Sequence, residues 1–302
     1  MSFVTEKIRN IAIAGHGSTG KTTLLEHILF QSGVISKPEL IDSGKTVSDF
    51  GEDEISRKIS VRTSLTHCHV RDTKINFLDT PGSSDFVGEV ILAFRAAESA
   101  LVMIDAKSGV QIETIKLWRN LDSRTKPRMV FLTRMDEERA NFSASLDDVK
   151  NKFKANCVPV TIPMGEGSSY KGVIDVINGI SYALPSSHDQ KEVSGPIPAD
   201  FQKMYEDARA QLSEAAAEGD DELMEKYLME GELNQEEILK GLKEALAAAK
   251  VVPAFAGSGL KNSGVAAFLE FAARIAPSPL HLALESTTVA DGSETLIGVD
   301  PL

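Results

Sequence analysis

Residues Gly15 to Thr22 match the phosphate-binding pattern G-x-x-x-x-G-K-[ST] at every specified position. In this pattern the glycines let the backbone wrap around phosphates, the lysine reaches the β- and γ-phosphates, and the final hydroxyl ligates Mg²⁺. We expect nucleotide contacts along the loop and into the following helix, from Gly15, His16, Gly17, Ser18, Thr19, Gly20, Lys21, Thr22 and Thr23. Lys21 is also a candidate catalytic residue and Thr22 a candidate metal ligand. A glycine-rich turn that binds nothing is the alternative.

A second candidate site follows the apolar run 75–78. Asp79-Thr80-Pro81-Gly82 places a carboxylate at the tip of an expected strand, as in the Walker B arrangement. There Asp79 would hold Mg²⁺ through water, and the N–H of Gly82 would reach the γ-phosphate. A plain turn is the alternative for this short pattern when it is taken alone.

Two further loops could recognise a base. Thr133-Arg134-Met135-Asp136 stands after the apolar run 129–132, where guanine-nucleotide proteins carry N-K-x-D. Asp136 can accept hydrogen bonds from N1–H and the exocyclic amine of guanine, donors that adenine lacks, and Arg134 can lay a planar cation over the ring. The loop with Ser258, Gly259 and Leu260 could contact the base oxygen through its backbone.

The elements that would position these loops have the pattern of an α/β fold. Four continuous apolar runs are typical of strands buried on both faces of a parallel sheet, and they cover 11–14, 100–104, 129–132 and 251–256. Helical periodicity follows Lys21 and stops at Gly33, and a second helix is expected from Asp85, with Asp85 as its cap. Residues 61–70 and 73–78 predict an antiparallel hairpin, and 264–276 predict a closing helix. We expect a P-loop NTPase domain with a mostly parallel sheet and helices on both faces.

A long insertion interrupts this alternation. Residues 158–250 begin with short β-like pieces and continue as acidic helices, which predicts an inserted α+β subdomain. We therefore assign residues 1–157 and 251–280 to the nucleotide-binding domain. Residues 281–302, rich in Ser, Thr and Gly, are expected to be a linker toward a second domain.

Composition limits the class of protein. The 302 residues are 42% hydrophobic and 25% charged, which is typical of globular chains and excludes disorder. No apolar run is long enough for a membrane span, and two cysteines cannot form a disulfide framework, so we expect a soluble cytoplasmic protein without membrane contact. The net charge is −12, and residues 199–250 supply eight of these excess negative charges. Such acidity argues against binding free DNA.

Taken together, these motifs resemble those of translational GTPases, most closely the N-terminal G domain of elongation factor G. Residues 79–86 are similar to that family's D-T-P-G-H-V-D-F, and residues 257–265 to its G-S-A-F-K-N-K-G-V. Residues 57–61 are similar to R-G-I-T-I, and 220–228 to its acidic insertion. The resemblance covers residues 8–280. It implies GTP, GDP and Mg²⁺ as ligands, GTP hydrolysis, and a ribosomal partner whose stalk protein meets the insertion.

Several positions depart from the family pattern. Ser60 replaces the threonine that closes over Mg²⁺ but keeps the hydroxyl, so we retain it as a metal ligand with Thr22 and Asp79. Ser18 replaces an aspartate associated with a monovalent cation. Thr133 and Arg134 replace Asn and Lys, which favours a paralogue of elongation factor G.

The most consequential departure is Ser83, which stands where the family has the histidine that orients the attacking water. We carry Ser83 with Lys21 and Gly82 as a catalytic candidate, and we expect hydrolysis to be weak without the ribosome. One alternative is a GTP sensor that docks on ribosomes and barely hydrolyses. Another is a P-loop kinase or ATPase. We expect a monomer, here as the N-terminal fragment of a longer factor.

Overall fold

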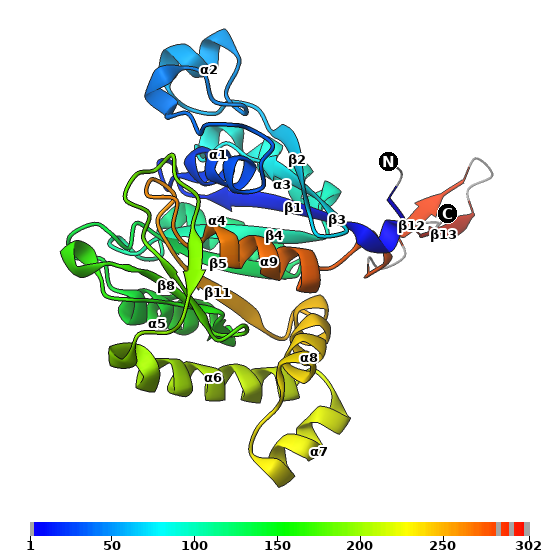
Figure 1. Cartoon of the computed structure of the whole chain (residues 1–302). Coiled ribbons are helices and arrows are strands. Elements are labelled where there is room, and N and C mark those ends of the chain that lie inside the picture. The colour runs from blue at the N-terminus through cyan, green and yellow to red at the C-terminus, as the bar shows by residue number, and fades with distance from the viewer. Residues whose placement is uncertain (1–2, 282–284, 290–292, 299–302) are drawn as a thin grey trace.

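The computed structural model describes residues 3–281, 285–289 and 293–298, and a seven-stranded sheet forms its centre (Figure 1). In spatial order the strands are β2 Ser64–Val70, β3 Thr73–Asp79, β1 Ile8–Gly15, β4 Ser99–Asp105, β5 Arg128–Thr133, β11 Val252–Ala256 and β6 Cys157–Pro159. Only β2 runs antiparallel to its neighbour; the other pairs are parallel. Strand β1 has β3 on one side and β4 on the other, so the strand order reverses next to β1. Ligands of open α/β sheets bind outside the carboxyl ends of the strands at such a switch point.

Helices cover both faces of this sheet. α1 and α9 contact each other on one face, while α3, α4 and α5 contact strands β1 and β5 from the other (Figure 1). The bounds are α1 Lys21–Gln31, α2 Glu52–Arg57, α3 Val87–Ala96, α4 Ile112–Asp122, α5 Phe142–Phe153 and α9 Val265–Ile275. The α/β class with a mostly parallel sheet and helices on both faces is therefore confirmed.

The four apolar runs are the buried strands β1, β4, β5 and β11, and the predicted hairpin is β2–β3. The expected start of the second helix was wrong. Asp85 does not cap it; α3 begins at Val87, after the single turn Ser84–Phe86. Ser83 precedes that turn and its Oγ accepts a hydrogen bond from the backbone N–H of Asp85 (3.4 Å), so the chain makes a separate turn before the helix starts.

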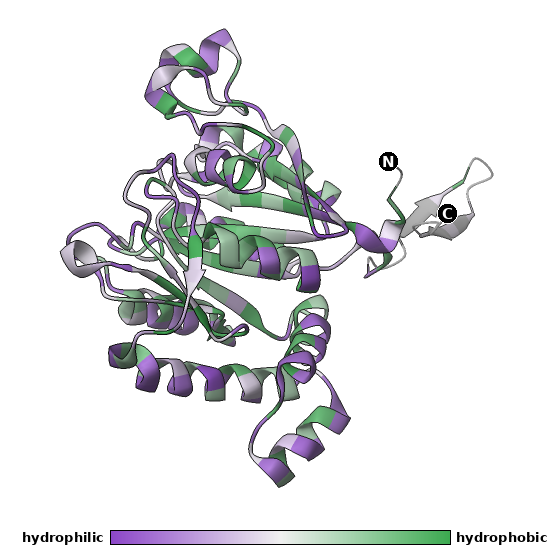
Figure 2. Ribbon diagram, in the orientation of Figure 1, coloured by the Kyte–Doolittle hydropathy of each residue, from purple (hydrophilic) through white to green (hydrophobic). Residues whose placement is uncertain are grey.

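The expected insertion contains a second sheet and three helices. The antiparallel strands are β7 Thr161–Pro163, β8 Gly172–Asp175, β9 Ile180–Ala183 and β10 Val193–Gly195. The helices are α6 Gln202–Ala217, α7 Asp221–Glu230 and α8 Gln235–Ala247. Their turns alternate between polar and apolar colours in Figure 2, as expected for amphipathic helices, whereas the central strands are mostly hydrophobic. The boundary expected at 157/158 runs through β6, which pairs with β11 in the large sheet.

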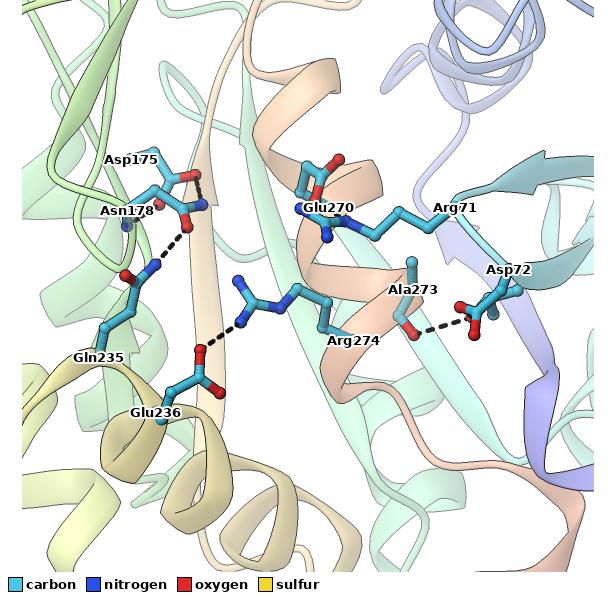
Figure 3. A network of polar contacts seen from close by, with 10 residues as sticks. Arg71, Asp72, Asp175, Asn178, Gln235, Glu236, Glu270, Ala273 and Arg274 are labelled. Atoms are coloured by element: carbon cyan, nitrogen blue, oxygen red, sulfur yellow. Dashed lines mark hydrogen bonds and ion pairs between the residues drawn. The ribbon is translucent and has the colours of Figure 1, made fainter.

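Polar contacts join the insertion to the core at α8 (Figure 3). Arg274 Nη2 of α9 lies 3.2 Å from Glu236 Oε1 of α8. On the other side of α9, Arg71 Nε lies 2.8 Å from Glu270 Oε2. These ion pairs are partly exposed, so they add little stability each; the first lies between α9 and α8, and the second between α9 and the β2–β3 turn.

The only tryptophan of the sequence, Trp118, lies in the core on α4. Its ring is 2% exposed and stacks on Phe153 at a centroid distance of 4.1 Å and an interplanar angle of 4°. The guanidinium of Arg128 lies 5.0 Å from the same ring. The residue packs α4 against α5 and the sheet.

The segment expected as a linker is described only in part. Residues 282–284, 290–292 and 299–302 of that segment lie outside the described residues. The remainder contains a two-stranded hairpin, β12 Glu285–Thr288 and β13 Glu294–Ile297. In the described part of the chain, no helix has the length and apolar character needed to cross a membrane.

Candidate functional site

The phosphate-binding motif forms the loop between the carboxyl end of β1 and the amino end of α1. Gly20 is the N-cap of α1 with φ +84°, a left-handed conformation that glycine adopts without strain. Thr19 Oγ1 donates to the carbonyl of His16 (2.9 Å), and Lys21 Nζ donates to the carbonyls of Gly15 (3.2 Å) and His16 (3.1 Å). The free N–H groups of the first helical turn and the Lys21 cation therefore face the same loop, an arrangement that suits phosphate.

The three predicted metal ligands come together beside this loop. Thr22 Oγ1 donates to Asp79 Oδ2 at 2.8 Å and lies 3.3 Å from Ser60 Oγ. They come from three separate segments: the start of α1, the end of β3 and the loop before β2. Within the described residues, no group of three or more His, Cys, Asp or Glu side chains could hold a metal ion. A metal site here therefore depends on hydroxyl groups as well as on carboxylate.

The electrostatics of Asp79 fit a divalent cation. The residue is 1% exposed, and its Oδ1 atom is buried without a hydrogen-bond partner. Burial raises the pKa of Asp79 to about 6, although the nearby Lys21 cation opposes the shift. A buried carboxylate oxygen with free lone pairs is an unfavourable group that a hard cation would stabilise. Hydroxyl and carboxylate oxygens are also the ligand types that Mg²⁺ prefers, so the residues present fit that ion.

Two acidic residues of this site were missed in the sequence. Asp49 is 6% exposed, and burial raises its pKa while hydrogen bonds from Ser60 and Thr22 oppose that rise. Glu54 holds the segment that carries Ser60. Its Oε1 accepts the backbone N–H groups of residues 61 (2.9 Å) and 62 (3.1 Å), which directly follow Ser60. Neither residue belongs to a short motif, so no local signal marked them.

Gly82 lies directly against the phosphate-binding loop. A Cβ atom at this position would lie 2.8 Å from Gly17 Cα and 2.9 Å from Gly17 N, closer than real side chains approach a backbone. The next residue, Ser83, is half-buried, and its hydroxyl accepts a hydrogen bond from the backbone N–H of Asp85. Nearby, His16 Nδ1 lies 2.8 Å from Glu113 Oε2 at the first turn of α4.

These groups surround a cavity of about 490 Å³, within the range of small-molecule sites. The predicted residues that line it are His16, Gly17, Ser18, Gly20, Lys21, Thr22, Thr23, Ser60, Gly82, Ser83 and Arg134. Asp49 and Glu113 line it as well. Gly15, Thr19 and Asp79 lie directly behind this lining, through the contacts given above. Thr133, Asp136, Ser258, Gly259 and Leu260 are not part of it.

Arg134 connects the cavity to the base-recognition motif. Its Nη1 donates to Asp105 Oδ2 (3.1 Å), and its Nη2 donates to the carbonyl of Ser18 in the phosphate-binding loop. Thr133, which stands in place of the motif's asparagine, has no side-chain amide with which to brace that loop. Arg134 provides a brace from the neighbouring position. Its stacking on a base stays a prediction, as does the role of Asp136.

The last predicted loop lies next to this motif. The N–H of Met135 donates to the carbonyl of Gly257 (3.1 Å), which ties the two loops together. A Cβ on Gly259 would lie 3.4 Å from Leu24 N, so this part of the loop approaches the start of α1. Ser258 is 1% exposed and Leu260 is 52% exposed. The phosphate side and both predicted base loops therefore form one contiguous region at the carboxyl edge of the sheet.

Comparisons with known proteins agree with this geometry. Residues 6–278 match the family model described as the elongation factor Tu GTP binding domain. A crystal structure of a protein from Thermus thermophilus is similar, with a TM-score of 0.83 and 32% sequence identity. The alignment covers 91% of this chain and 41% of the Thermus chain, so this chain spans less than half the length of that protein. The chain therefore belongs to the family of elongation factor Tu GTP-binding domains, the guanine-nucleotide-binding domains of translational GTPases.

Proposed function

We propose that this chain is the GTP-hydrolysing N-terminal domain of an elongation factor G-type factor that acts on the ribosome. The observation that carries the proposal is the meeting of Thr22, Ser60 and Asp79 beside Lys21, with an unpartnered carboxylate oxygen on Asp79. Ser60 belongs to a segment separate from the phosphate-binding loop. In GTPase switches the γ-phosphate and Mg²⁺ order such a separate segment, so this cluster can respond to a bound triphosphate. The large insertion supports the elongation factor G type.

In this proposal each residue has a separate task. Lys21 binds the β- and γ-phosphates, and the N–H of Gly82 donates to the γ-phosphate. Asp136 accepts hydrogen bonds from the guanine edge, and the loop with Ser258, Gly259 and Leu260 meets the base oxygen. Arg134 braces the phosphate-binding loop at Ser18 and also covers the ring, and Thr133 precedes it at the end of β5.

Thr22, Ser60 and Asp79 would hold Mg²⁺, with Asp49 close by. The ion would neutralise charge on the β- and γ-phosphate oxygens. Lys21 adds positive charge from a buried position: burial lowers its pKa, while Asp79 and Asp49 oppose the fall. Its two carbonyl contacts in the loop are those that phosphate oxygens would replace.

The position of the attacking water decides between hydrolysis and sensing. The Ser83 side chain is shorter than the histidine of the family pattern, which favours slow hydrolysis by the isolated domain. The alternative function is therefore a GTP sensor that docks on ribosomes with little or no hydrolysis. Single-turnover hydrolysis with and without ribosomes separates the two: a ribosome-stimulated rate supports the enzyme, and a near-zero rate in both conditions supports the sensor.

The insertion offers a surface for the ribosomal stalk protein. On α7, Leu228 and Met229 are 77% and 79% exposed, between the acidic residues Glu225 and Glu230. We assign this exposed apolar pair to the contact with that partner. We expect Leu228→Ser with Met229→Ser to weaken ribosome-stimulated turnover and to leave nucleotide affinity unchanged.

The first test of the proposal is nucleotide binding. We expect fluorescent GDP and GTP analogues to bind more tightly with Mg²⁺ present, and excess ATP not to displace them. Equal competition by ATP would remove the guanine assignment of Asp136. The family match already excludes the P-loop kinase or ATPase that the phosphate-binding loop alone would allow.

A further inference from the structure

A short strap from the insertion reaches the core next to the predicted base loop. The strap consists of residues 190–192, between β9 and β10. Lys191 Nζ donates to the backbone carbonyl of Gln31 at the end of α1 (3.1 Å), and the N–H of Glu192 donates to Gln31 Oε1 (3.2 Å). Asn262, inside the predicted base loop, donates its side-chain N–H to the carbonyl of Gln190 (2.8 Å). The strap thus touches both α1 and the loop.

Glu192 makes the central contacts of the strap. Its carboxylate is buried, with the residue 7% exposed. One oxygen accepts the backbone N–H of Gly264 and the other that of Ala266, each at 2.7 Å. Gly264 is the N-cap of α9 and has no side chain with which to cap the helix. Glu192 therefore supplies the missing cap from 72 residues away, at the helix end where negative charge is most favourable.

These contacts fix the end of the predicted base loop. Residues 257–264 connect β11 to α9. The first residue of this loop is held by Met135, whose N–H donates to the Gly257 carbonyl. Its last residue, Gly264, is held by Glu192, and Asn262 between them is held by the strap. The position of Ser258, Gly259 and Leu260 thus depends on groups at both ends of the loop.

We propose that Glu192 is a positioning residue for guanine recognition, which holds the loop 257–264 where its backbone N–H groups meet the base oxygen O6. This inference rests on the proposed function, in which that loop contacts the base. Glu192 itself does not touch the nucleotide. It acts through Gly264 and Ala266, and it makes the insertion a structural part of the base site.

The test compares GDP with 6-thio-GDP, in which only O6 is replaced by sulfur, a weaker hydrogen-bond acceptor. Dissociation of each nucleotide from the full chain is followed by stopped-flow displacement. In Glu192→Gln one of the two N–H groups loses its acceptor, so we expect GDP to dissociate about tenfold faster. The preference for GDP over 6-thio-GDP should also shrink by about threefold or more, because the O6 contact is loosened. A purely structural role would leave that preference unchanged.

Two further variants complete the experiment. Gln31→Ala removes the contact to the Glu192 backbone at a partly exposed position, so it keeps the test decisive if Glu192→Gln does not fold; we expect about a threefold faster dissociation. Glu98→Gln is the matched control, because Glu98 is also a buried carboxylate that accepts a backbone N–H, from Asn10 (3.1 Å) at the opposite end of β1. It should behave like the wild type.

The outcomes separate the inference from the proposed function. If the wild type binds GDP but the folded strap variants keep its dissociation rate and its preference over 6-thio-GDP, the positioning role is wrong and the proposed function stands. If the wild type itself shows no guanine-selective binding, the proposed function is wrong, and this inference fails with it.

Discussion

Gly82→Ala tests the contact between the loop after β3 and the phosphate-binding loop. The added Cβ would lie 2.8 Å from Gly17 Cα, 2.9 Å from Gly17 N and 2.5 Å from Lys21 Nζ. Carbon atoms in good contact are about 3.5–4.0 Å apart, so the backbone of one loop must move by several tenths of an ångström or more. The lysine end can swing aside, but the Gly17 backbone lies within a loop that Thr19 and Lys21 hold by hydrogen bonds.

Overpacking of this kind costs about 1–3 kcal/mol, which corresponds to about 5- to 150-fold in an equilibrium constant. The displaced groups, Gly17 and Lys21, also serve the β-phosphate, so binding of both nucleotides should weaken. Because the N–H of Gly82 is proposed to meet the γ-phosphate, we expect the affinity for a non-hydrolysable GTP analogue to decrease by more than the affinity for GDP. Fluorescence titration with both nucleotides measures the ratio directly.

Gly88→Ala is the matched control for this experiment. Gly88 is in α3, and a Cβ there would have no atom within 4 Å. Alanine should therefore leave both affinities unchanged and stabilise the helix by about 0.5–1 kcal/mol. If Gly82→Ala folds and keeps the wild-type ratio of GTP to GDP affinity, the close approach seen here has no part in reading the γ-phosphate.

Three other predictions follow from the site. Asp136→Asn should lower GTP affinity at least tenfold without improving ATP binding, because a charged acceptor is lost, and an unchanged Kd in a competition titration would contradict the role of Asp136. Ser83→His should raise ribosome-stimulated single-turnover hydrolysis on the order of 10²-fold, with Ser84→His at the neighbouring exposed position as control; equal rates in both variants would remove Ser83 from the reaction. Burial raises the pKa of Glu192 from 4.5 to about 7, and Tyr170 and Tyr182, the other titratable groups whose pKa it influences, stay neutral in this range because their own pKa values are raised too. The folded protein therefore holds an extra proton between about pH 4.5 and 7. The difference in the free energy of unfolding between the wild type and Glu192→Gln should accordingly fall by as much as about 3 kcal/mol as the pH rises from 4.5 to 8. Urea unfolding across this range measures that difference, and a constant value would contradict the buried-proton argument.

The parts of the site that the sequence revealed are those encoded by neighbouring residues. The run from Gly15 to Thr22 is contiguous, and the apolar strands around it are buried on both faces, so a local pattern is enough to predict them. Asp79 was predicted because it directly follows an apolar strand, and the structure brings it to Thr22.

What the sequence did not reveal depends on contacts between distant segments. Glu192 and its two N–H partners are separated by 72 and 74 residues, and Arg134 reaches Ser18 across 116. Nothing in the residues around Glu192 distinguishes it from a solvent-exposed acid. The start of α3 was misplaced for a local reason, because the hydroxyl of Ser83 competes with Asp85 as a capping group two positions earlier.

The location of Trp118 in the core has an optical consequence. All four tyrosines of the chain, Tyr170, Tyr182, Tyr205 and Tyr227, fall between residues 158 and 250, whereas the single tryptophan is in the nucleotide-binding core. Tryptophan emission, excited where tyrosine does not absorb, thus reports on the core alone, and the tyrosine bands of the second-derivative absorbance spectrum report on the insertion. A single unlabelled sample can therefore show whether the two parts melt in one step or two. The same indole can also serve as an energy donor to a fluorescent nucleotide bound at the loop before α1.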